Sequence, residues 1–174
     1  LFGLGIDNAI VELDSDEPAE PTDGSCKPFV DILLETGIRE QNASVEYLEV
    51  LEPVTYDEGD VHIAASPHDG FRLSFTIDYP NPTIGTQFAS FEVTSDSFLN
   101  EIAPARTFAL EKDVEDLQKQ GLIKGGSLDN AIVVGNDGIV NKSDLRFPDE
   151  FVRHKILDLM GDLALLGQPL KGHV

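Results

Sequence analysis

Three polar side chains recur at four-residue intervals near the end of the chain, within a segment otherwise rich in apolar residues. They are His154, Asp158 and Asp162. A helix turns about 100° per residue, so Asp158 lies about 40° and Asp162 about 80° from His154 around the axis. A histidine nitrogen and a carboxylate oxygen one turn apart can converge on one zinc ion. The same spacing fits a solvated stripe, or a histidine hydrogen-bonded to an aspartate one turn away.

A catalytic zinc ion takes three protein ligands and keeps one position open, so a third ligand must come from elsewhere. No other histidine has a spacing that recommends it as that ligand. Two further side chains have chemistry that suits a catalytic site. Lys155 can meet a phosphate as a point charge, and Thr107, which follows Pro104, can donate a hydrogen bond to an oxyanion. Most lysines and threonines are simply solvated or structural, so the pattern alone assigns neither a role.

The helix that carries these residues is predicted over residues 149–166, with Asp149 and Glu150 where the helix dipole favours acidic groups. A second helix is predicted over residues 26–36, capped by Ser25 and stopped by Gly37. A short helix capped by Ser95 or Ser97 and another over residues 111–120 are also expected. Alternating or bounded apolar runs predict strands at residues 44–54, 60–65, 71–79, 87–94 and 130–135, and residues 5–13 are predicted to be a turn that leads into a strand.

An internal repeat indicates how the chain is organised. Residues 7–11, Asp-Asn-Ala-Ile-Val, recur at 129–133, and Phe29-Val30 recurs as Phe151-Val152 at the same offset of 122 residues. In both copies a predicted strand is followed by a predicted helix, which suggests a duplicated β-then-α unit. We therefore expect a first domain over residues 1–45 and a second over residues 46–174.

Composition excludes several classes of protein. The formal net charge of −20 repels phosphate backbones, so we expect no nucleic-acid partner. No apolar run approaches the roughly 18 residues of a membrane-spanning helix, so no transmembrane segment is expected. Cys26 is the only cysteine, which excludes an internal disulfide and favours the reducing cytoplasm.

Several motifs taken together give the chain a family resemblance. The run at residues 151–158, Phe-Val-Arg-His-Lys-Ile-Leu-Asp, is the most specific. The other matching stretches are residues 3–8, 23–25, 28–30, 75–79, 105–108, 125–127 and 145–162. Over essentially its whole length the chain resembles the zinc-dependent UDP-3-O-acyl-N-acetylglucosamine deacetylases of lipid A biosynthesis in Gram-negative bacteria.

The resemblance implies an α+β fold of two similar small domains, each a sheet packed on helices. It also implies a βαβ insert at about residues 121–147 of the second domain, lining a passage for the acyl chain. The substrate would be UDP-3-O-(3-hydroxyacyl)-N-acetylglucosamine, with Zn²⁺ polarising the amide carbonyl and activating water. The implied roles are zinc ligation by His154 and Asp158, oxyanion assistance by Thr107, orientation of a catalytic histidine by Asp162, and substrate contact by Tyr79, Phe108 and Lys155.

The chain departs from the family pattern at three places. The family's Glu-His pair, which supplies the general base and third ligand, falls upstream of Leu1, and its catalytic histidine falls beyond Val174. We therefore expect both domains to be incomplete at their outer ends and the chain to be inactive by itself. His173 is interpreted as a bystander, because residues 169–172 match the strand that precedes the family's catalytic histidine. Leu110 replaces an aromatic residue often found in the substrate wall.

Two alternatives from other classes stay open at this point. One is a non-catalytic homologue that keeps the UDP and acyl contacts, and the other is an acidic interaction domain whose histidine and aspartate merely pair. Zinc content separates the interaction domain from both the deacetylase and the non-catalytic homologue. The sequence also leaves open a fusion of the parent protein to a 3-hydroxyacyl carrier-protein dehydratase, which some relatives carry.

Overall fold

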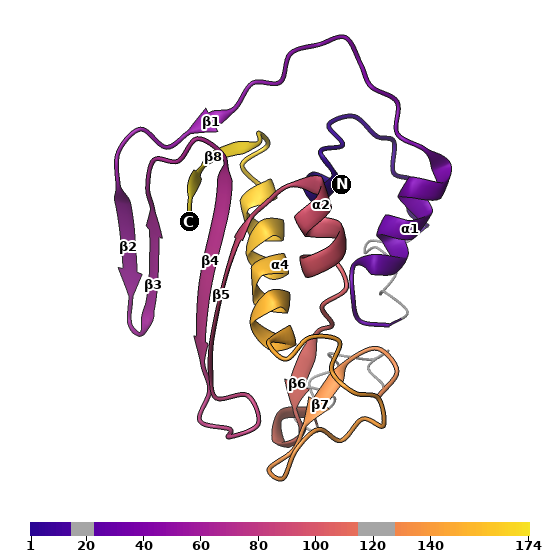
Figure 1. Cartoon of the computed structure of the whole chain (residues 1–174), viewed down its shortest axis with the longest axis vertical. Coiled ribbons are helices and arrows are strands. Elements are labelled where there is room, and N and C mark those ends of the chain that lie inside the picture. The colour runs from indigo at the N-terminus through magenta and orange to yellow at the C-terminus, as the bar shows by residue number, and fades with distance from the viewer. Residues whose placement is uncertain (15–22, 115–127) are drawn as a thin grey trace.

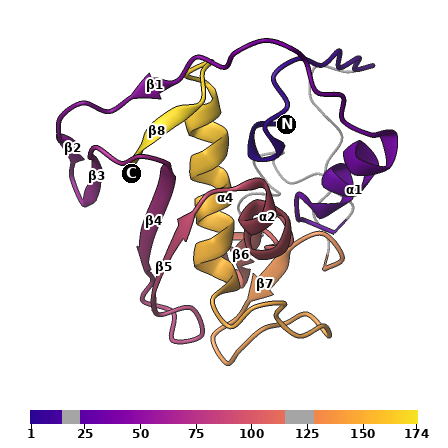
Figure 2. The same ribbon diagram turned by 45° about the horizontal axis from the view of Figure 1, so that its top comes forward.

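The computed structural model describes residues 1–14, 23–114 and 128–174, and it confirms an α+β fold. Its main sheet has the strand order β1-β8-β4-β5, formed by Leu48–Glu49, Leu170–His173, Phe71–Asp78 and Thr86–Glu92. Strands β4 and β5 are antiparallel, whereas β8 runs parallel to both β1 and β4. Helix α4 (Glu150–Ala164) runs between this sheet and the short helix α2 (Ser95–Ser97), as both views show (Figures 1 and 2).

The core lies where α4 packs on β4 and β5. Strand β4 alternates as a half-covered antiparallel strand should: Leu73 and Ile77 are buried, whereas Arg72 and Asp78 are exposed. On α4 the residues at 0% exposure include Phe151, Val152 and Ile156. Burial of apolar area at about 25 cal/mol per Å² makes this contact the main source of stability for the region around His154.

Two smaller sheets flank the main one. Strands β2 (Val54–Glu58) and β3 (Val61–Ala65) form an antiparallel hairpin at one side of the molecule. Strands β6 (Phe108–Leu110) and β7 (Ile132–Val134) form a parallel pair near the first turn of α4. Between α2 and β6 the chain makes a short π-helical turn, η2 (Phe98–Ile102).

Helix α1 (Lys27–Thr36) confirms the predicted first helix. Pro28 stands in its first turn, and Gly37 ends it with a φ of +88°. The capping residue differs from the prediction: the N-cap is Cys26, and Ser25 instead accepts the Lys27 N–H through its hydroxyl at 3.3 Å. A threonine likewise takes the cap predicted for Ser95 or Ser97, because Thr94 and Ser97 form a reciprocal capping box at α2.

The strand predicted within residues 5–13 is wrong. The chain has a 3-10 turn, η1 (Phe2–Leu4), and then no regular secondary structure up to residue 13. Ile10 is 93% exposed, and among the described residues this segment pairs with no strand. Residues 44–54 give only the two-residue strand β1 and the first residue of β2. Apolar alternation alone does not make a strand, since the backbone also needs a neighbouring strand to bond.

Strands β3, β4 and β5 confirm three further predictions within one residue or two. The helix expected over residues 111–120 is helical at 111–114, and the remainder lies outside the described residues, as does much of the expected insert, including Gly125, Gly126 and Ser127. The division into domains at residue 45 stays a prediction. Within residues 1–14, 23–114 and 128–174, no helix is long and apolar enough to cross a membrane.

Candidate functional site

His154 lies in the second turn of α4 with its side chain buried. Its Nδ1 is 3.1 Å from the Ala105 carbonyl oxygen. A carbonyl oxygen only accepts, so Nδ1 carries the proton and a neutral ring leaves a lone pair on Nε2. Burial lowers the pKa of His154, partly opposed by the Asp158 carboxylate. The ring therefore favours the neutral form, which is the form that binds metal ions.

The second predicted ligand stands directly before that lone pair. Asp158 Oδ1 is 3.3 Å from His154 Nε2, and the carboxylate is partly exposed. In a tetrahedral zinc site with bonds of about 2.0–2.1 Å, two donor atoms lie about 3.3–3.4 Å apart. The observed distance between these two atoms therefore matches that expected for two ligands of one zinc ion. Among the described residues, no group of three or more His, Cys, Asp and Glu side chains can hold a metal ion.

The three predicted substrate residues lie beside this pair in one continuous set. Lys155 Nζ is 2.8 Å from the other Asp158 oxygen, and it stands 5.8 Å from the centre of the Phe108 ring. The Tyr79 ring meets the same Phe108 ring edge-on at 5.7 Å. Phe108 is supported by the buried Phe151 ring, at 4.9 Å. The structure thus brings Tyr79, Phe108 and Lys155 together next to Asp158.

Thr107 is fixed mainly through its backbone. Its N–H donates to the Gly24 carbonyl at 2.8 Å, and its carbonyl accepts the Ile132 N–H at 2.8 Å. It is two residues from Ala105, which holds the His154 ring. Asp162 is exposed on α4, one turn beyond Asp158. The predicted roles of Thr107 and Asp162 stay predictions.

A cavity of about 580 Å³ is lined in part by residues that follow Tyr79 and Phe108 closely in the sequence. One wall is formed by the β4–β5 loop, at residues 80–82 directly after Tyr79. Another is formed by residues 110–112, which follow Phe108 in the sequence. Its lining residues are Pro80, Asn81, Pro82, Leu110, Glu111, Lys112, Val134, Gly135 and Asn136. Leu110, which stands where the family often has an aromatic residue, therefore forms part of a real wall.

The other histidines are engaged elsewhere. His173 lies in β8 and bonds Ser74 Oγ through Nε2 at 2.7 Å. His68 pairs with Glu92, and His62 pairs with Asp57 on the β2–β3 hairpin. None of these contacts involves His154 or Asp158.

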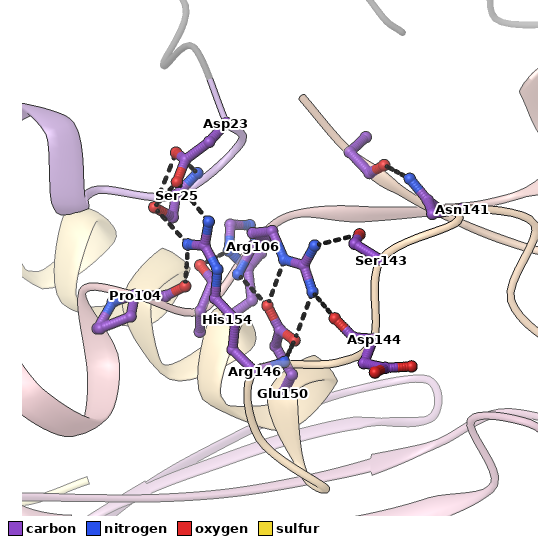
Figure 3. Close-up of polar contacts among 12 residues, drawn as sticks. Asp23, Ser25, Pro104, Arg106, Asn141, Ser143, Asp144, Arg146, Glu150 and His154 are labelled. Carbon is purple, nitrogen blue, oxygen red and sulfur yellow. Dashed lines mark hydrogen bonds and ion pairs between the residues drawn. The ribbon is translucent and has the colours of Figure 1, made fainter. Parts of the chain in front are cut away.

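Sequence reasoning missed a buried ionic network beside His154 (Figure 3). Its centre is Glu150, which is 0% exposed and binds the guanidinium of Arg106. A second arginine, Arg146, reaches Asp23 at 2.6 Å, far away in the sequence. Burial alone would raise the pKa of Glu150. Hydrogen bonds from the Arg106 side chain and from the Arg106 and Arg146 backbone N–H groups, together with the positive charge of Arg106, outweigh the effect of burial and lower the pKa overall. The sequence feature that could have indicated this network is the presence of Arg106 and Arg146 in the matching stretches at residues 105–108 and 145–162.

Comparison with known proteins adds independent information. The family model described as "UDP-3-O-acyl N-acetylglycosamine deacetylase" matches residues 1–174. A UDP-3-O-acyl-N-acetylglucosamine deacetylase of Bdellovibrio bacteriovorus is 49% identical over 175 residues, covering 100% of this chain and 57% of that protein. Proteins of the same name from Haemophilus influenzae and Oleidesulfovibrio alaskensis are each 47% identical, over 99% and 98% of the chain. The chain spans 57% and 56% of those two relatives.

Proposed function

The chain belongs to the UDP-3-O-acyl N-acetylglycosamine deacetylase family, and on that premise we propose that it supplies two zinc ligands and part of the substrate site of a lipid A pathway deacetylase. The reaction is hydrolysis of the N-acetyl group of UDP-3-O-acyl-N-acetylglucosamine. The observation that carries the proposal is the pair formed by His154 Nε2 and Asp158 Oδ1 at 3.3 Å, with the opposite ring nitrogen held by Ala105.

Zinc bound by this pair would polarise the acetamide carbonyl and lower the pKa of a bound water. The residues of the chain prepare the site for it. His154 is kept neutral by burial, and its N–H is held away from the ion by the Ala105 carbonyl. Thr107 is assigned a hydrogen bond to the developing oxyanion. Asp162 is assigned the orientation of a catalytic histidine.

The substrate contacts follow from the set beside Asp158. Lys155 carries a positive charge suited to the diphosphate, and its contact with Asp158 keeps it at the edge of the site. The Tyr79 ring, held edge-on to Phe108, offers an aromatic surface to uracil. Leu110 and Val134 give the adjoining cavity an apolar wall suited to part of an acyl chain.

The test uses the full-length gene product that contains these residues. His154→Ala and Asp158→Ala should each lower zinc content and abolish acetate release from UDP-3-O-acyl-N-acetylglucosamine. The matched control is His173→Ala, since His173 contacts neither ligand. It should keep zinc and turnover within a few-fold of the parent protein. Unchanged zinc stoichiometry in His154→Ala, measured by elemental analysis, would show that His154 is not a ligand.

Zinc content and acetate release, together with a measurement of UDP binding, separate the alternatives. Zinc and UDP binding without acetate release would indicate a non-catalytic homologue, and absence of zinc would indicate an interaction domain in which His154 and Asp158 merely pair. A cytoplasmic location stays a prediction about the parent protein, and fusion to a dehydratase domain stays open.

A further inference from the structure

The irregular segment at residues 104–107 is fixed by groups outside it. The Pro104 and Ala105 carbonyls accept hydrogen bonds at 2.7 and 3.1 Å, and the Arg106 and Thr107 N–H groups donate at 3.0 and 2.8 Å. Arg146 donates to Pro104 and His154 donates to Ala105. Arg106 donates to Glu150, and Thr107 donates to Gly24. Because no helix or strand holds residues 104–107, these contacts decide where the Ala105 carbonyl stands relative to the His154 ring.

Glu150 makes the largest contribution to this arrangement. Its Oε1 accepts from the Arg106 backbone N–H at 3.0 Å and from Arg106 Nε at 2.8 Å. Its Oε2 accepts from Arg106 Nη2 at 3.1 Å and from the Arg146 N–H at 2.6 Å. A carboxylate offers about four acceptor positions, so two arginine residues occupy all of them. At 0% exposure no water competes for the carboxylate.

The two arginines extend the arrangement to neighbouring segments (Figure 3). Arg106 also donates to Ser143 Oγ at 3.0 Å and to the Asp144 carbonyl at 2.8 Å. Arg146 also donates to Asp23 at 2.6 Å and to Ser25 at 3.1 Å. Residues 23–25, 104–107 and 143–146 are therefore tied to the first turn of α4.

The spacing of residues on α4 relates this network to His154 and Asp158, the two proposed zinc ligands. Glu150 stands one turn before His154 on the same helix. Its carboxylate holds the Arg106 N–H, and the imidazole one turn later donates to the Ala105 carbonyl, which belongs to the same peptide unit as that N–H. The partner of the remote ring nitrogen fixes the tautomer and orientation of a ligating histidine. Glu150 thus holds the peptide unit whose carbonyl oxygen orients the His154 ring.

A role in stability alone explains this network poorly. Desolvation of a buried ion pair largely offsets its Coulombic gain, and apolar residues of similar volume often serve as well. The planar guanidinium of Arg106 instead presents its donors in a rigid fork, which fixes its position relative to the Glu150 carboxylate.

We propose that Glu150, through its ion pair with Arg106, is a positioning residue that holds the Ala105 carbonyl so that His154 presents Nε2 to the metal ion. The inference rests on the proposed function, because it takes His154 Nε2 to be a metal ligand. Its own readouts are metal affinity and the tautomer of His154 in the metal-free protein.

The central variant is Glu150→Gln in the full-length gene product. A glutamine oxygen can replace only one of the two carboxylate oxygens, and the N–H₂ group then faces donors of Arg106 or Arg146, so the hold on residue 106 is weakened. Zinc affinity, measured by competition with a chelator, should fall about 10–100-fold. Nitrogen NMR of the metal-free protein should show His154 losing its single Nδ1–H tautomer. The matched control, Asp149→Asn, removes the Asp149–Arg153 ion pair at the same helix end without touching residues 104–107, and should leave both readouts unchanged.

A milder variant decides the question if Glu150→Gln does not fold. Ser143→Ala removes one hydrogen bond at the outer end of the Arg106 guanidinium, and it should lower zinc affinity a few-fold with a partial tautomer change. Folded variants with parental affinity and an unchanged His154 tautomer would overturn the positioning role. Loss of zinc in His154→Ala beside such a result would leave the proposed function intact, whereas zinc retained in His154→Ala would overturn the proposed function itself.

Discussion

Replacing Gly24 with alanine should destabilise the protein far more than an ordinary glycine substitution in a turn. Gly24 has a φ of +78°, and an added Cβ would lie 2.1 Å from the Asn130 carbonyl oxygen and 2.7 Å from the carbonyl carbon. Both atoms are backbone, so neither can turn aside. The Gly24 carbonyl also accepts the Thr107 N–H at 2.8 Å, next to the proposed site.

Three costs combine in this substitution. The left-handed backbone costs an alanine about 1–2 kcal/mol. Relieving the overlap with Asn130 requires a shift of roughly 1 Å, and overpacking of this kind costs about 1–3 kcal/mol. The shift weakens the Thr107–Gly24 hydrogen bond, worth about 1 kcal/mol. We expect a total of about 3–6 kcal/mol, a large part of the roughly 5–15 kcal/mol that stabilises most proteins.

Urea unfolding followed by circular dichroism measures this cost as a change in midpoint at constant slope. Gly85→Ala is the matched control, because Gly85 has a φ of +59° but an added Cβ would meet no atom of a non-adjacent residue within 4 Å. It should lose only the backbone cost of about 1–2 kcal/mol. Equal losses in the two variants would show that residues 23–25 are not seated against Asn130 and would refute the packing on which the expected cost rests.

Three further predictions concern the site and its surroundings. Lys155→Ala should raise KM for the UDP substrate more than it lowers kcat, since Lys155 is assigned to the diphosphate; a purely kcat effect in steady-state assays would contradict that assignment. Because the pKa of Glu150 is lowered in the folded state, its contribution to stability is complete above the ordinary glutamate pKa of about 4.3 and is lost as the pH falls through the lower folded value. Urea unfolding between pH 6 and pH 3, from about 1.7 units above to about 1.3 units below that pKa, should therefore show a smaller acid loss in Glu150→Gln than in the parent protein. Pre-steady-state assays of His173→Ala should show an unaltered chemical step, and a large loss there would mean that the contact with Ser74 has a role in catalysis.

The helix that carries His154 and Asp158 was predictable because one local rule suffices for it. Apolar residues at helical spacing, an acidic first turn and the polar stripe all indicate a helix over residues 149–166, and α4 spans Glu150–Ala164. The strands at residues 71–79 and 87–94 were equally accessible, since alternation in an antiparallel pair reflects one covered face. Local rules also place His154 and Asp158 on one side of the helix, where their donor atoms are 3.3 Å apart.

Features that depend on distant partners were not predictable in this way. Residues 5–13 have the composition of a strand, but a strand exists only where another backbone accepts its hydrogen bonds. The helix dipole accounts for an acidic Glu150 in the sequence, yet the residue is fully buried because Arg106 and Arg146 arrive from other segments. Nothing in the spacing of these three residues indicates that they meet.

The internal repeat shows the same division between local and distant causes. Its two copies do give two helices, α1 and α4, but the equivalent positions have opposite environments: Ile32 is 60% exposed, whereas His154 is 9% exposed. Burial keeps the His154 ring neutral, and the Ala105 carbonyl gives its Nδ1–H a partner; neither condition follows from the helix itself. A histidine placed at residue 32, which is 60% exposed, would be largely solvated. The proposed metal site therefore depends on the segments that surround α4, and Glu150 is the residue of α4 that holds one of those segments through Arg106.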